Sequence, residues 1–124
     1  MSEAAKLLLA ELEAALRAQA RLGRPIGYLA LAAKLMLAGP HRIHRLTQAL
    51  EVLARRDLAA GRPLLATLAV SRSGIPGRGF FQLLSSLGGY QGPEEGPEAR
   101  RWHGEALAAA VAYWGGPEPP DAAG

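Results

Sequence analysis

The stretch GPHRIHRLTQALEVLARRD, residues Gly39–Asp57, joins a tight turn to a strongly periodic apolar pattern. The Gly-Pro pair forces a turn, because proline has no N–H and glycine tolerates positive φ. After it, apolar residues recur at spacings of three and four, which is typical of a helix with one buried side. The core-facing row is Ile43, Leu46, Leu50 and Leu53. We therefore expect a helix over residues 41–60.

The polar side of this helix is crowded at its start. Two histidines and two arginines occupy the first turns, namely His41, Arg42, His44 and Arg45. Positive charge is unfavourable at a helix N-terminus, where the helix dipole prefers anions. Phosphate, however, would be attracted both by free backbone N–H groups and by guanidinium groups. Three explanations stay open: a DNA-recognition helix, a metal or acid/base site, or a solvated helix end.

Three further helices are expected. Residues 2–22 have an apolar residue at every fourth position, and Ser2 can cap their first turn. A shorter helix fits residues 27–37. The last helix runs from residue 97 or 98 to residue 114, because Pro97 suits the first helical position.

A strand and an ambiguous segment follow the central helix. Residues 64–71, LLATLAVS, are short and apolar, and Thr67 and Val70 favour a buried strand. A lone strand leaves backbone groups unpaired, so its partner lies within the chain or across a dimer. Residues 80–87 have the apolar spacing of a short helix, yet Phe80 would also suit the start of an antiparallel return strand.

Length and composition indicate one cytoplasmic domain. The chain has 124 residues, the size of a single domain. The absence of cysteine excludes disulfides, thiolate metal ligands and cysteine nucleophiles. Acidic residues interrupt the apolar N-terminus, so we expect neither a signal peptide nor contact with a membrane. A mainly helical domain with a short β element is expected over residues 1–114, with a disordered tail over residues 115–124.

Charge is distributed unevenly along the chain. The net charge is +3, but from Arg17 to Arg78 eleven basic residues accompany only two acids, a net of +9. The segments before and after this one are both acidic. A basic middle between acidic ends indicates an anionic partner for that part of the chain.

The order of elements in the basic segment is that of a winged helix-turn-helix: a helix, a tight turn, a second helix, a strand and a basic loop. In such domains the second helix enters the major groove of DNA, where arginine can bind guanine with two donors. The side chains expected to face bases are Arg42, Arg45 and Gln48. The side chains expected to hold phosphates are His41, His44, Arg72 and Arg78.

The stretches GYLALAAKLML and GPHRIHRLTQAL are similar to two helices of the C-terminal domain of alkylguanine-DNA alkyltransferases and their alkyltransferase-like relatives. These are the Tyr-x-x-Leu-Ala helix and the arginine-bearing recognition helix, and the similarity covers residues 25–79. That family carries a Pro-Cys-His-Arg active site after the recognition helix, where this chain has LLATLAVSR. The resemblance therefore implies a winged helix that binds DNA, without alkyl transfer.

Other chemistries lack a complete set of residues. His41, His44 and His103 could form a three-histidine metal site, but neighbouring arginines repel a cation. The glycine-rich loop GIPGRGFF has neither the dinucleotide-binding spacing nor the ending of a P-loop. We therefore expect a protein that is not an enzyme and that needs no metal or cofactor.

A protein-interaction module is the stronger alternative to binding of DNA or RNA. Aromatic and arginine side chains favour interface centres, and the last helix begins with Arg100, Arg101 and Trp102. An adaptor, a homodimer, or an inhibitor that docks onto a protein or ribonucleoprotein would fit. DNA binding predicts arginines that converge on one face, whereas an interaction module predicts an exposed apolar patch with scattered arginines.

Overall fold

Five α-helices and a pair of very short strands make up residues 2–116, the part of the chain that the computed structural model describes. In chain order the elements are α1 (Glu3–Leu22), β1 (Ile26–Gly27), α2 (Tyr28–Lys34), α3 (Arg42–Ala60), a 3-10 helix (Leu65–Leu68), β2 (Ala69–Val70), α4 (Arg78–Ser86) and α5 (Pro97–Trp114). The expected class, mainly helical with a short β element, is confirmed.

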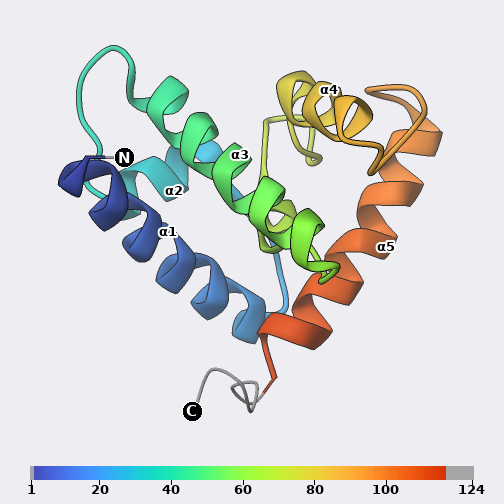
Figure 1. Ribbon diagram of the computed structural model, residues 1–124, viewed down its shortest axis with the longest axis horizontal. Coiled ribbons are helices and arrows are strands. Elements are labelled where there is room, and N and C mark those ends of the chain that lie inside the picture. Colours follow the sequence, from blue (N-terminus) through green and yellow to red (C-terminus); the bar gives the residue numbers. More distant parts are fainter. Residues whose placement is uncertain (1, 117–124) are drawn as a thin grey trace.

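The helices surround the 3-10 helix. In Figure 1, α1 descends from the left and α5 from the right, and their ends meet at the bottom. α3 crosses the front of the molecule, with α2 behind its N-terminal half and α4 at the upper right. The 3-10 helix contacts α1, α3 and α5, and all four of its residues are buried. The core is therefore centred on this short segment.

Helix boundaries follow the predicted signals at α1, α3 and α5. The Ser2 hydroxyl accepts a hydrogen bond from the N–H of Ala5 at 3.1 Å, and Gly23 ends α1 in the left-handed conformation. Gly61 ends α3 in the same way. Pro97 is the first residue of α5. Of the expected tail, residues 117–124 lie outside the described part of the chain.

The strand predicted over residues 64–71 is wrong for its first half. Leu65–Leu68 form a 3-10 helix, and only Ala69–Val70 are extended. The N–H and the hydroxyl of Thr67 both donate to the carbonyl oxygen of Leu64, at 3.1 and 2.7 Å. These local bonds take the place of strand pairing, because threonine hydroxyls that bond nearby backbone favour turns.

The partner of β2 lies within the chain. β1 and β2 pair in parallel, with Ile26 opposite Ala69 and Gly27 opposite Val70. Of the two alternatives for residues 80–87, the helix is confirmed and the antiparallel return strand is wrong, because residues 80–86 belong to α4 and bury Phe80, Phe81, Leu83 and Leu84. Strand pairing therefore requires no second copy of the chain.

The carboxylate of Asp57 is fully buried near the end of α3. Its Oδ1 accepts hydrogen bonds from Nε of Arg62 at 2.7 Å and from Nε of Arg56 at 3.2 Å. Its Oδ2 accepts one from the backbone N–H of Leu65 at 3.1 Å. Two guanidinium groups and one amide thus compensate the buried charge and tie α3 to the 3-10 helix.

The indole of Trp114 brings α5 and α1 into the same cluster. The guanidinium carbons of Arg17, Arg56 and Arg62 lie 4.9, 5.7 and 5.3 Å from the centroid of its ring, within the range of cation–π attraction. Glu13 of α1 pairs with both Arg17 and Arg56. Arginines from three parts of the chain therefore stabilise the fold, and their charges are not free on the surface to bind a ligand.

Replacement of Asp57 should destabilise the protein strongly. Asp57→Ala leaves two guanidinium groups and a buried N–H without their acceptor, and we expect the free energy of unfolding to fall by about 3–5 kcal/mol. Chemical denaturation measures this loss. Glu51→Ala, which removes a half-buried carboxylate of α3 that makes no ion pair within residues 2–116, should cost less than about 1 kcal/mol. Equal losses in the two variants would contradict the assignment.

α2 ends three residues earlier than the predicted helix over residues 27–37. The N–H of Leu37 donates to the carbonyl oxygen of Ala32 at 3.0 Å, and Met36 between them has a φ of 58°. This pattern is the left-handed helix stop that glycine usually provides. Met36 is 88 % exposed, so its side chain recovers little of the strain by burial.

Met36→Gly should therefore stabilise the protein. Glycine adopts the left-handed conformation without strain, and we expect a gain of about 0.5–1 kcal/mol in the free energy of unfolding. Met36→Ala is the matched control, because it removes the same exposed side chain but keeps the Cβ atom that causes the strain. A glycine variant no more stable than the alanine variant would show that the turn stores no strain.

Candidate functional site

The start of α3 is exposed and lacks a side-chain cap. His41 occupies the capping position but makes no capping hydrogen bond, and the first turn contains no acidic residue. Within residues 2–116, the backbone N–H groups of Ile43 and His44 have no acceptor, whereas Arg42 and Arg45 donate to the carbonyl oxygens of the preceding turn. Two free N–H groups thus lie beside exposed basic side chains, an arrangement that attracts anions.

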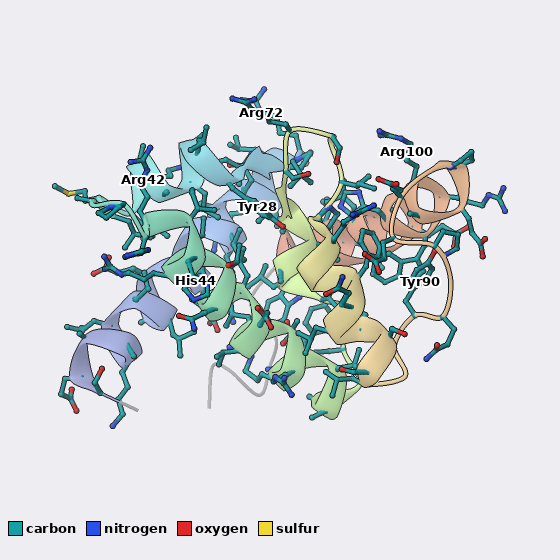
Figure 2. All side chains as sticks on the ribbon, turned by 90° about the horizontal axis from the view of Figure 1, so that it is seen from above. Tyr28, Arg42, His44, Arg72, Tyr90 and Arg100 are labelled. Atoms are coloured by element: carbon teal, nitrogen blue, oxygen red, sulfur yellow. The ribbon has the colours of Figure 1, made fainter. Side chains whose placement is uncertain are left out.

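The three side chains predicted to face bases do not share one surface. Arg45 and Gln48 line a groove of about 330 Å³ between α3 and the N-terminal end of α1. Nη1 of Arg45 also donates to the carbonyl oxygen of Ala38 at 3.4 Å. Arg42 instead projects along another edge of the molecule, and Figure 2 shows the side chain of Arg72 along the same edge.

A tight loop over residues 71–77 presents Arg72. Ser71 donates to the carbonyl oxygen of Ile75 through its backbone N–H and through its hydroxyl, both at 2.9 Å. Gly74 has a φ of 86°, which closes the turn, and Arg72 at its tip is exposed. The hydroxyl oxygen of Tyr28 accepts a hydrogen bond from the N–H of Gly77 at 3.0 Å.

Tyr28 thus joins the start of α2 to the end of the loop. Burial raises the pKa of its phenol, so the hydroxyl stays protonated at neutral pH. The sequence alone does not indicate this role of Tyr28, because its partner is a backbone N–H 49 positions along the chain. The glycine-rich composition of the loop was the only signal that a close contact forms there.

An apolar groove of about 540 Å³ lies between α2, the start of α3 and β2. Leu29, Ile43 and Val70 contribute apolar surface, and Arg72 stands at its rim. Leu29 is 53 % exposed in this groove. The site therefore combines cationic groups with an open apolar surface.

Arg78 differs from Arg72 although both flank the same loop. Its Nη2 lies 3.3 Å from Oε1 of Glu95, and its Nε lies 3.9 Å from Oε2 of Glu94. No signal in the sequence connected these two acids with Arg78. Of the four arginines that DNA binding requires on one face, Arg42 and Arg72 project along one edge in Figure 2, Arg45 lines the groove against α1, and Arg78 pairs with acids.

The basic residues of the middle segment fall into two groups. Four make ion pairs with carboxylates: Arg17, Arg56, Arg62 and Arg78. Seven are exposed and make no ion pair within residues 2–116: Arg21, Arg24, Lys34, Arg42, Arg45, Arg55 and Arg72. The two acids of the same segment are the buried Asp57 and the half-buried Glu51. The exposed charge of this segment is therefore almost entirely positive.

The residues predicted to bind a protein partner lie on α5. Trp102 is half-buried, and its ring centroid is 5.7 Å from that of Phe81 and 5.1 Å from that of Tyr90. Arg100 and Arg101 are exposed. In Figure 2, Arg100 projects along the same edge as Arg72 and Arg42.

The three histidines do not come together. His41 and His44 are exposed at the start of α3, whereas His103 is buried and its Nε2 lies 2.8 Å from the carbonyl oxygen of Thr67. His103 therefore belongs to the core and forms no site with the other two histidines. No group of three metal-ligating side chains occurs in residues 2–116. In the same part of the chain, none of the helices is both long and apolar enough to cross a membrane.

Comparison of the chain with protein families, curated proteins and solved structures found no match.

The buried histidine predicts a dependence of stability on pH. Burial lowers the pKa of His103 below its ordinary value of 6.5, although the Thr67 carbonyl opposes this shift. The unfolded chain therefore takes up a proton at a higher pH than the folded protein does. The free energy of unfolding should be constant above the unfolded pKa and should fall as the pH decreases through the folded pKa.

Chemical denaturation between about pH 7 and pH 5 measures this slope. His103→Gln is the matched variant, because its side-chain amide can still donate to the Thr67 carbonyl but does not titrate. We expect a flatter profile for this variant. The same slope in both proteins would exclude His103 as its cause.

Proposed function

We propose that the chain binds nucleic acid, with duplex DNA preferred over RNA, through a basic edge formed by Arg42, Arg72 and the free N–H groups of Ile43 and His44. The observation that carries the proposal is the division of the basic residues: every arginine and lysine of the middle segment that makes no ion pair within residues 2–116 is exposed. Exposed cations without carboxylate partners attract polyanions, and this attraction weakens as the salt concentration rises.

Phosphate groups suit this edge for two reasons. The uncapped start of α3 offers free N–H groups with a favourable dipole, and the adjacent guanidinium of Arg42 adds a full charge. Arg72 stands across the apolar groove, on the tip of a loop that internal hydrogen bonds and Tyr28 hold in place. Two cationic groups along one edge would therefore contact one nucleic-acid backbone.

The order of α2, turn, α3, β2 and loop supports a winged helix-turn-helix as the form of this interface. In that arrangement the start of α3 would face the major groove, where the exposed side chains of Arg42 and His44 would reach bases. The loop over residues 71–77 would act as the wing. It differs from a β-hairpin wing, because β2 has two residues and pairs in parallel with β1.

A protein partner is the second candidate, and the apolar groove favours it. Leu29 is 53 % exposed there, and Met36, in the turn between α2 and α3, is 88 % exposed. A partner with an apolar side chain and a nearby carboxylate would fit the groove and Arg72. Such a complex would lose little affinity in salt compared with binding to a nucleic-acid backbone.

Removal of the basic edge should weaken binding to DNA. In fluorescence anisotropy with a labelled duplex, we expect Arg42→Ala/Arg72→Ala to lower affinity by about tenfold or more. The dependence of log K on log salt concentration should become shallower by about 0.9 for each phosphate that the variant no longer neutralises.

Arg21→Ala/Arg24→Ala is the control with the same change of net charge. Arg21 lies in the last turn of α1 and Arg24 just after it, and Figure 1 shows this end of α1 at the bottom, away from the start of α3. A smaller loss in the control than in the test variant would support a local interface. Equal losses would indicate attraction to the whole charged surface, and no binding by the wild-type protein at low salt would exclude the proposal.

A further inference from the structure

An acidic loop, residues 88–96, covers one of the basic residues beside the proposed interface. Glu94 and Glu95 of this loop both pair with Arg78, the first residue of α4. Nε2 of Gln82, one turn further along α4, donates to Oε2 of Glu94 at 3.2 Å. Two carboxylates thus occupy the position where the sequence predicted a phosphate contact.

The loop is held over α4 by its own packing. The ring of Tyr90 is buried, with its centroid 5.5 Å from that of Phe81 and 5.1 Å from that of Trp102. The Tyr90 hydroxyl donates to the carbonyl oxygen of Pro93 at 2.9 Å, directly before Glu94. The anchor therefore fixes the backbone just before the two glutamates, of which Glu94 is half-buried and Glu95 extends into solvent.

The paired charges border a cavity beside the loop over residues 71–77. The cavity has a volume of about 530 Å³ and is lined by both loops and by the starts of α4 and α5, with Ser73, Arg78, Glu95 and Arg100 among the lining residues. Arg100 makes no ion pair within residues 2–116, and in Figure 2 it projects along the same edge as Arg72. Arg78 thus lines the same cavity as the exposed Arg100 but is itself paired with two carboxylates.

We propose that Glu94 and Glu95 are intramolecular competitors of phosphate, which mask Arg78 in the free protein and are displaced from it by a nucleic-acid backbone. The inference rests on the proposed function and adds its regulation. Carboxylate and phosphate bind guanidinium groups with similar geometry, so they compete for Arg78. The Arg78 and Glu95 side chains are 69 % and 73 % exposed, and ion pairs in solvent are weak enough to be exchanged.

Competition by Glu94 and Glu95 lowers the affinity of the protein for a nucleic-acid backbone in two ways. Release of Arg78 costs its ion pairs, and the two freed carboxylates stay within a Debye length of the bound phosphates and repel them. A target must therefore supply several phosphates at once to displace the loop. The ion pairs of Arg78 with Glu94 and Glu95 therefore favour binding of a continuous polyanion over binding of a single phosphate ion.

Glu94→Gln/Glu95→Gln tests this inference in the full chain with a labelled DNA duplex. Glutamine keeps the length of each side chain and removes its charge. We expect a roughly three- to tenfold gain in affinity at low salt, with a salt dependence steeper by about 0.9 because the unmasked Arg78 neutralises one more phosphate. In the presence of Arg78→Ala, the same two substitutions should give a much smaller gain.

Glu11→Gln/Glu105→Gln is the matched control, because both glutamates are exposed and make no ion pair within residues 2–116. An equal gain in the control would overturn the inference, since it would show a general effect of net charge. A gain that persists without Arg78 would also overturn it.

The two proposals fail in different ways. If the wild-type protein binds through Arg42 and Arg72 but Glu94→Gln/Glu95→Gln brings no gain in affinity, the masking of Arg78 is contradicted and the proposed interface is supported. If neither the wild-type protein nor the variant binds at low salt, both proposals are contradicted.

Discussion

The buried carboxylate of Asp57 is the constraint on which the position of the basic edge depends. It takes the N–H of Leu65 and thereby starts the 3-10 helix directly after the turn that follows α3. The 3-10 helix leads into β2, whose pairing with β1 places the following loop beside α2. Tyr28 then holds the end of that loop at Gly77. A single charge at one end of α3 thus determines where Arg72 lies at the other.

The arginines of the chain have two distinct uses, and burial separates them. Around Trp114, whose Nε1 donates to the Pro63 carbonyl at 2.8 Å, arginines neutralise Asp57 and Glu13 and pack on the indole. At the start of α3 and on the following loop, Arg42 and Arg72 face solvent without carboxylate partners among residues 2–116. Net charge along the sequence does not distinguish these uses. Only the exposed group bears on the binding of an anion.

Helices were predictable from the sequence because their signals are local. The periodic apolar rows, Ser2, Gly23, Gly61 and Pro97 mark the ends of α1, α3 and α5 within one or two residues. The segment from Leu65 to Val70 was not predictable, because its conformation depends on a carboxylate eight positions away and on a parallel partner in β1. An apolar run with β-branched residues fits a strand until those partners are known.

The same distinction applies to the candidate site. The exposure of the first turn of α3 follows from helical geometry, so His41, Arg42, His44 and Arg45 were expected on the surface. The ion pairs of Arg78 were not expected, because they join α4 to a loop whose path depends on the packing of Tyr90. Burial of His103 was missed for a similar reason: its partner, the Thr67 carbonyl, belongs to a turn that the sequence suggested was a strand.

The most direct test of the account is an amide NMR titration of isotope-labelled protein with duplex DNA at low salt. It requires no substitution and reports each backbone N–H separately. The account predicts that the largest changes occur at the start of α3, foremost at Ile43 and His44, and in the loop that carries Arg72. Changes confined to the Trp114 cluster or to the groove between α1 and α3, or no changes at all, would contradict it.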